Sequence, residues 1–169
     1  MPEFPNPSLR CASRSDVIIA YLDYFREGVI DRVESISDEE IRSSRLASGW
    51  TPIELLRHLT FVELRWLEWG FEGQNVEDPW GDRRDDRWYV SEDESCESVI
   101  EELRSRGRCS AAIIRESGLD ALGQPGPRWK DPNDPPSLDR ILLHLLQEYA
   151  RHLGHLDIVV EIAGGSTGE

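Results

Sequence analysis

Three of the four histidines in this 169-residue chain lie with a glutamate in one stretch, 144-HLLQEYARHLGHLD-157. His144, Glu148 and His152 are spaced four residues apart, and His155 follows three residues after His152. Side chains at this spacing share one face of a helix. Imidazole and carboxylate groups that converge can share a proton or bind a divalent ion. Zn²⁺ is the first choice, with Fe²⁺, Ni²⁺ and Mn²⁺ as alternatives.

A helical wheel relates this cluster to the buried face of its own helix. With His144 at zero, Glu148 falls at about 40°, His152 at about 80° and His155 at about 20°. Apolar residues occupy roughly 60° to 200° of the same wheel. They are Ile141, Leu142, Leu145, Leu146, Leu156 and Val159. The polar cluster therefore overlaps one edge of the apolar face.

The fourth histidine, His58, belongs to a different predicted helix and lies inside its apolar face. Four apolar residues fall within about 80° of His58 on a wheel. They are Leu55, Val62, Trp66 and Trp69. A buried imidazole without a partner costs roughly 1–3 kcal/mol. Glu148 and His152 are the obvious partners, because they lie on an inward edge of another helix of the same small protein.

Two interpretations of these residues stay open at this point. In the first, His58, Glu148 and His152 bind a metal ion and leave at least one coordination position open, as in catalytic zinc sites. In the second, the helix face is only hydrogen-bonded or salt-bridged, with the imidazoles paired to Glu148. His144 and His155 are each an alternative ligand, a hydrogen-bond donor to the ligating carboxylate or a surface residue, and a position beside the ligands or a structural role is favoured.

The elements that must position these residues are helices. Apolar residues recur at three- and four-residue spacing in four segments. The segments are residues 15–35, 51–70, 91–117 and 137–163. No stretch alternates for long enough to predict a strand. The pattern predicts an all-α protein, a four-helix bundle with long connections between the second and third helices (73–90) and between the third and fourth (123–136).

Local signals support the helix ends. Thr51, Pro52 and Glu54 form the pattern of an N-cap, a first-turn proline and a capping box. The acidic run Glu92–Glu94 suits the first turn of the third helix. Gly164 and Gly165 are expected to end the fourth helix.

Composition limits the class of protein and its partners. The length suits a single domain over residues 1–169, with 1–14 and 164–169 as flexible tails. A net charge of −14 argues against nucleic acid and anionic membrane surfaces. The three cysteines show no CxxC spacing, and Cys96 and Cys109 are expected to be small packing residues. With no apolar leader or membrane span, the expected location is the cytoplasm.

Two segments carry a resemblance to a known family. They are 48-SGWTPIELLRHLTFVELRW-66 and 137-SLDRILLHLLQEYARHLGHLDIVVEIAGGSTG-168. Together they resemble the DinB-like superfamily of metal-dependent four-helix proteins, and most closely its actinobacterial "mini-circle protein" branch. Mycothiol-dependent maleylpyruvate isomerase and the mycothiol S-transferases belong to the same superfamily.

The resemblance implies a ligand set and a reaction. The family's histidine on the second helix and its pair on the fourth correspond to His58, Glu148 and His152. By similarity, the metal would hold a low-molecular-weight thiol such as mycothiol as the thiolate, and the thiolate would attack an electrophilic second substrate. No catalytic residue beyond the metal ligands is assigned. The alternative function is a non-catalytic metal- or ligand-binding helical bundle, acting as a homodimer.

Aromatic and charged residues outside the ligand set have two interpretations each. Trp66, Trp80 and Trp129 are candidates for the walls of a small-molecule pocket, although tryptophans in long connections also pin loops to a core. The arginines of 81-GDRRDDRW-88 either clamp a substrate carboxylate or belong to a self-neutralising solvated loop, and the second is favoured. Glu63 is expected to pair with a neighbouring helix rather than to act as a base.

Overall fold

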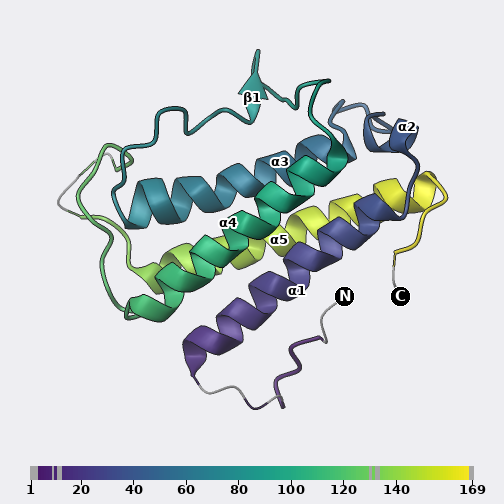
Figure 1. The fold of residues 1–169 in the computed structure, drawn as a ribbon. Coiled ribbons are helices and arrows are strands. Elements are labelled where there is room, and N and C mark those ends of the chain that lie inside the picture. The colour runs from purple at the N-terminus through teal and green to yellow at the C-terminus, as the bar shows by residue number, and fades with distance from the viewer. Residues whose placement is uncertain (1–3, 9, 11–12, 130, 132–133, 168–169) are drawn as a thin grey trace.

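The computed structural model describes residues 4–8, 10, 13–129, 131 and 134–167. Most of them are helical, as the all-α prediction requires (Figure 1). The helical elements are α1 (Arg14–Glu34), α2 (Asp38–Ile41), α3 (Pro52–Glu63), the π-helix η1 (Leu64–Phe71), α4 (Cys96–Glu116) and α5 (Leu138–Ile162). Cys11 and parts of both predicted tails, 1–14 and 164–169, lie outside the described residues.

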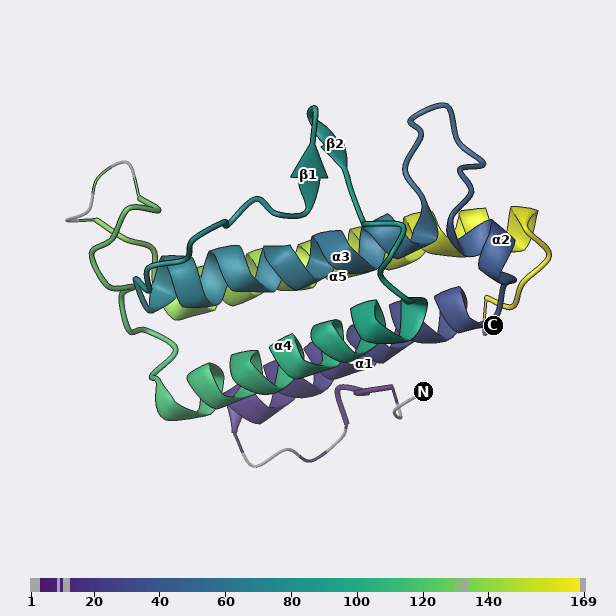
Figure 2. The ribbon, with the colours of Figure 1, turned by 45° about the horizontal axis from the view of Figure 1, so that its top comes forward.

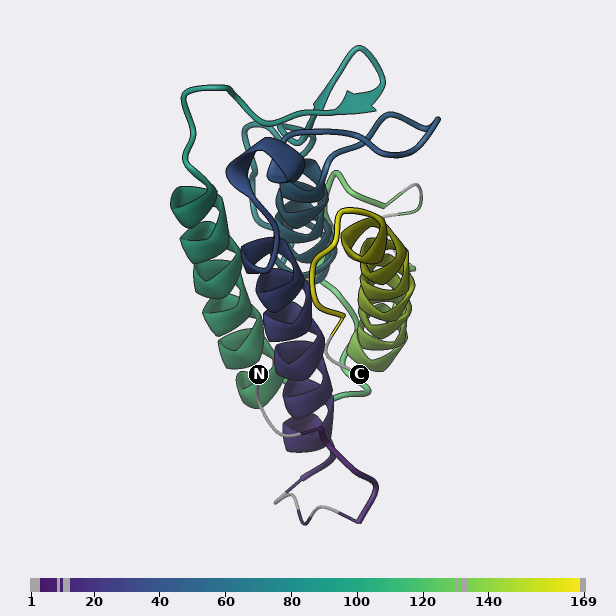
Figure 3. The same ribbon diagram turned by 90° about the vertical axis from the view of Figure 1, so that its right-hand side faces the viewer.

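The long helices form two packed layers. Figure 2 shows α3 and α5 in one layer and α1 and α4 in the other. In the view of Figure 3, α4 and α5 lie on opposite sides, with α1 and α3 between them. Helix α1 packs on α4 and α5, and α3 packs on the same two helices. The core is drawn from all four, and its members include Leu22, Val29, Leu55, Leu59, Leu103, Ile114, Leu145 and Leu156.

Helix ends follow the sequence signals in part. The Thr51 amide donates to the Glu54 carboxylate at 2.8 Å, and Pro52 is the first residue of α3. Gly164 ends α5 with a φ of +81°, which a glycine adopts without a Cβ penalty. The start of α4 differs from the prediction. The Ser95 hydroxyl accepts from the Ser98 amide at 3.1 Å and caps the helix there, so Glu92–Glu94 precede it.

The connection between η1 and α4 holds a hairpin that the sequence did not predict. Strands β1 (Arg83–Arg84) and β2 (Arg87–Trp88) pair antiparallel, and Asp85 and Asp86 turn the chain with positive φ values of 50° and 60°. Aspartate is among the few residues that tolerate this conformation. Two-residue strands are too short to show alternation. The hairpin stands over the α3–α5 layer (Figure 2).

Two further sequence expectations can be compared with the structure. Cys109 does not pack in the interior, because its position on α4 faces solvent, whereas Cys96 is half-buried against the core. Among the described residues, none of the helices is both long and apolar enough to cross a membrane.

Near the chain ends, Phe4 packs edge-on against Tyr24 at 5.2 Å, and the Ser166 amide donates to the Ser35 hydroxyl at 3.2 Å.

Candidate metal centre

The structure brings His58, Glu148 and His152 together. His58 lies in the middle of α3, and Glu148 and His152 lie one turn apart on α5. One nitrogen or oxygen atom from each residue lies within 4.8 Å of the other two. Both histidines are buried, with 6% and 7% of their surface exposed, and Glu148 is half-buried. The three side chains therefore converge at a partly shielded point between the two helices.

The spacing of the donor atoms fits a small divalent ion. His152 Nε2 lies 3.2 Å from Glu148 Oε2. Two ligand atoms about 2.1 Å from a tetrahedral zinc ion are separated by about 3.4 Å. Burial, followed by the proximity of His58, lowers the pKa of His152 to about 4, although Glu148 opposes this shift. His152 is therefore neutral near pH 7, which is the state in which an imidazole binds metals.

One ring nitrogen of His152 lacks a hydrogen bond. Nδ1 is buried and has no hydrogen-bond partner within the described chain. A closed, purely structural network satisfies such atoms, because an orphaned polar atom costs roughly 1–3 kcal/mol. The imidazole–carboxylate donor set fits a cation site, whereas the unpaired Nδ1 is not the nitrogen beside Glu148 and shows only that the hydrogen bonds of His152 are incomplete.

Asp82 completes the surroundings of His58 and was missed by sequence reasoning. This side chain is fully buried, and its Oδ2 lies 3.1 Å from His58 Nδ1. Arg65 binds it twice, at 2.6 Å to Oδ1 and 3.1 Å to Oδ2. Burial alone would raise the pKa of Asp82, but the hydrogen bonds from His58 and Arg65 lower it below its ordinary value. An ionised carboxylate only accepts, so His58 Nδ1 donates to it, which points Nε2 away from Asp82.

Trp88 covers the same histidine from the hairpin. Its ring stacks on that of His58 with centroids 4.2 Å apart and planes 18° apart, and it meets His152 edge-on at 5.5 Å. Trp50, which precedes α3, packs against Trp88 at 6.0 Å. The connection that supplies Asp82 to one side of His58 thus supplies an aromatic cover to its face.

The two remaining histidines lie beside the cluster at different distances from it. His144 Nε2 is 3.5 Å from Glu148 Oε1, and its ring packs against Trp66 at 4.4 Å. His155 lies with its ring 5.8 Å from that of His152. His144 is thus the residue that reaches the carboxylate, whereas His155 lies beside the ring of His152.

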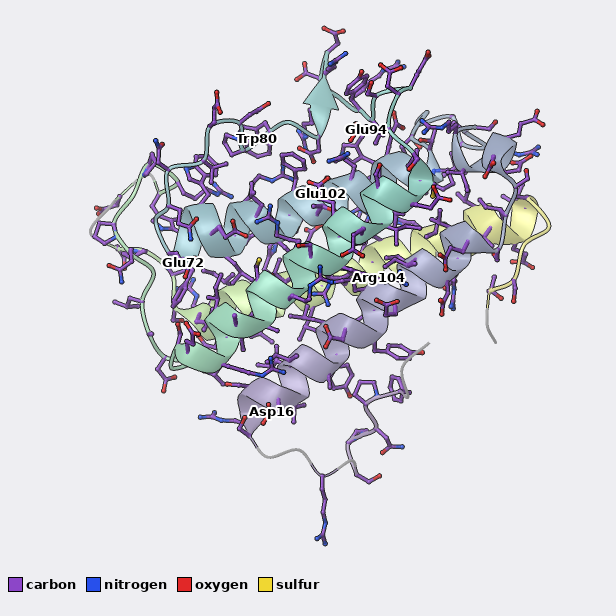
Figure 4. All side chains as sticks on the ribbon, in the orientation of Figure 1. Asp16, Glu72, Trp80, Glu94, Glu102 and Arg104 are labelled. Carbon is purple, nitrogen blue, oxygen red and sulfur yellow. The ribbon has the colours of Figure 1, made fainter. Side chains whose placement is uncertain are left out.

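The three candidate pocket tryptophans do not lie together. Trp66 and Trp129 line one hollow of about 330 Å³ beside His144. Trp80 is on the 73–90 connection, outside α3 (Figure 4), and stays 43% exposed. Its ring packs against the guanidinium of Arg65 at 4.4 Å. Trp80 therefore covers the arginine that holds Asp82 rather than walling the same hollow.

Glu63 has the interhelix role expected from the sequence. Its carboxylate is fully buried and accepts from Arg26 on α1 at 2.8 Å and 3.1 Å. The hydroxyls of Tyr149 on α5 and Ser110 on α4 also donate to it. This cluster ties α3 to the other three long helices.

Comparison with known proteins identifies a family. Searches of curated proteins and of solved structures found no match. The family model described as mycothiol-S-transferase matches residues 17–165, a range that contains α3, α4, α5, most of α1 and all three converging side chains. Because that match covers most of the chain, the protein belongs to the mycothiol-S-transferase family.

Proposed function

We propose that this protein is a divalent-metal-dependent thiol S-transferase in which His58, Glu148 and His152 bind the metal. The convergence of those three donors between α3 and α5 carries the proposal. Family membership supports mycothiol as the thiol substrate. The proposal includes a single DinB-like four-helix-bundle domain of the mini-circle branch and a cytoplasmic location, both of which rest on the sequence.

The reaction is a nucleophilic substitution or addition by sulfur. A divalent ion at this site supplies the chemistry that keeps a coordinating thiol deprotonated near neutral pH. The thiolate sulfur donates an electron pair to an electrophilic carbon, and a leaving group departs with the bonding pair. Where the electrophile is a conjugated double bond, the pair moves into the conjugated system instead, and later loss of the thiolate gives an isomerised product.

The chain's own residues prepare the site for this reaction. Asp82 and Arg65 fix the tautomer and ring orientation of His58 through a buried hydrogen-bond chain. Trp88 shields the two imidazoles from solvent on one side. The half-buried Glu148 contributes a negative charge that favours a cation. Zinc suits this N,N,O donor set best, and Fe²⁺, Ni²⁺ and Mn²⁺ also fit it.

Elemental analysis of purified protein tests the site directly. We expect about one equivalent of a divalent metal in the wild type and in Arg151→Ala, a control on the exposed side of α5. His58→Ala and Glu148→Ala should lose most of it while retaining helical circular dichroism. Equal metal content in all four proteins would contradict the ligand set.

The thiol dependence needs a separate assay on the metal-loaded protein. Mycothiol with an electrophile such as monochlorobimane should give a fluorescent thioether at a rate that falls with each ligand substitution. Metal retention without any thiol-dependent product would contradict the transferase proposal and leave a non-catalytic metal-binding bundle.

A further inference from the structure

The hollow beside the metal centre has walls of two chemical kinds. Its volume is about 330 Å³. It lies among η1, the connection before α5 and the first turns of α5, and its lining residues are Trp66, Trp129, Pro136, Arg140, Ile141 and His144. Two indole rings and two apolar side chains suit a planar apolar group, and a guanidinium suits an anion.

The aromatic wall is held in place by η1. The indole N–H of Trp129 donates to the Gly70 carbonyl at 3.2 Å. A Cβ at position 70 would lie 2.9 Å from the Trp129 ring, so glycine permits this close approach. Trp66 lies 6.0 Å from Trp129, centroid to centroid. The wall is thus formed before any ligand arrives, which lowers the entropy that binding would cost.

Positive charge lies at the hollow. The Arg140 side chain is exposed and, within the described part of the chain, makes no side-chain ion pair within 4 Å, although it interacts electrostatically with the adjacent Asp139. Arg128 packs against Trp66 at 4.7 Å and Trp129 at 5.4 Å, and its Nε is buried without a hydrogen-bond partner. The chain as a whole carries a net charge of −14. Two arginines beside an aromatic hollow stand out against this background and favour an anionic ligand.

His144 connects this hollow to the metal centre. It lines the hollow, and its Nε2 lies 3.5 Å from Glu148 Oε1. A molecule in the hollow would therefore lie one side chain away from the ligand set. Two reactants of a bimolecular transfer need this proximity.

We propose that this hollow binds the electrophilic second substrate and selects planar organic anions. The conjugated part lies against Trp66 and Trp129, and the carboxylate or similar anion interacts with Arg140. The assignment of this ligand as the second substrate rests on the proposed transferase function. The binding preference itself is a property of the hollow and can be measured without any reaction.

Calorimetric titration with a matched pair of probes tests the preference. Cinnamate and its neutral amide share a planar shape and differ in charge. We expect the full-length protein to bind cinnamate about tenfold more tightly than cinnamamide, a ratio typical of one charge-assisted contact. Arg140→Gln should abolish this ratio, and Trp129→Leu should weaken both probes. Arg151→Gln, which removes an exposed arginine from the same helix, should change neither affinity.

A repeat of the titration after chelator treatment separates this hollow from the metal. Retention of the cinnamate affinity is expected, because Arg140 and the indoles remain. Loss of binding on chelation would place the carboxylate on the metal and overturn the proposal, as would equal affinity for acid and amide or an unchanged ratio in Arg140→Gln. Failure of the transferase proposal is read independently, from the metal content and the thioether assay.

Discussion

Helices α3 and α5 meet at two polar clusters with opposite properties. One holds His58, Glu148 and His152; the other, only five residues further along α3, centres on Glu63. Glu63 is fully buried, and both of its oxygens accept hydrogen bonds from neighbouring helices. At the first cluster, by contrast, His152 keeps one buried nitrogen without a partner among the described residues.

The difference distinguishes a closed structural network from the cluster proposed to bind a cation. Every charge around Glu63 has a counter-charge or donor within the chain, so the network is complete and has no need of a ligand. The histidine cluster gathers lone pairs and a carboxylate with no cationic side chain among them, which leaves room for a cation. Similar residue types on the same two helices therefore form a closed hydrogen-bond network around Glu63 and a proposed cation site around His58.

The largest expected effect comes from breaking the closed network. Glu63→Ala leaves the buried guanidinium of Arg26 without its main counter-charge, and we expect a loss of about 3–5 kcal/mol in the free energy of unfolding. Glu161→Ala, at an exposed position of α5, is the control. Urea unfolding measures both. A loss below about 1 kcal/mol in Glu63→Ala would remove the contrast between the two clusters.

A smaller effect is expected from the carboxylate behind His58. Asp82→Asn removes the charge that orients the imidazole and should weaken zinc binding about 10- to 100-fold in a chelator competition assay. Asp86→Asn is a matched control in the same hairpin, because asparagine also tolerates positive φ. If the two variants bound zinc equally well, Asp82 would have no role in holding His58.

The smallest effect is a dependence of stability on alkaline pH. Burial, followed by the nearby Glu63, raises the pKa of Tyr149 well above 10. Between pH 10 and that raised value the unfolded chain loses the phenolic proton while the folded chain keeps it. Stability should therefore fall by about 1.4 kcal/mol per pH unit in this window, whereas below it the ionisation of Tyr149 should make no contribution to the pH dependence.

Tyr149→Phe supplies the comparison for this pH dependence. The variant should lose part of its stability at neutral pH, because the hydrogen bond to Glu63 is gone, but its stability should fall less steeply above pH 10. If the free energy of unfolding fell equally steeply with pH in the wild type and the variant, another group would cause the loss of stability at alkaline pH.

Sequence periodicity predicted the positions that depend on helix phase. His58 is buried and Glu148 and His152 lie on an inward edge, because the phases of α3 and α5 decide these positions and each helix begins near its predicted start. Asp82 could not be found in this way. Its burial depends on how a long connection folds back over another helix, and in the sequence it is one of several similar acids beside arginines.

A change in helix phase also explains why the burial of Trp66 and Trp69 was predicted wrongly. A continuous α-helix through residue 70 would place Trp66 and Trp69 fully in the core, but both are half-buried, and Arg65 is 3% exposed. The change from α3 to the π-helical η1 after Glu63 alters the phase. No local signal in the sequence marked this change, since the residues of η1 are also compatible with an α-helix.

The π-helix η1 has an implication for how the site could change. A π-helical hydrogen bond spans one residue more than an α-helical one, so η1 is equivalent to an α-helix carrying a single inserted residue. Deleting one residue at the start of η1 would remove that insertion, and the side chains beyond it would keep about the phase they have now. A return of η1 to α-helical geometry with all its residues kept would instead rotate the downstream side chains by about 100°, so Trp66 would leave His144 while His58, upstream, would keep its place. A change of helix type here would therefore remodel the hollow proposed to receive a substrate without moving His58, a proposed metal ligand.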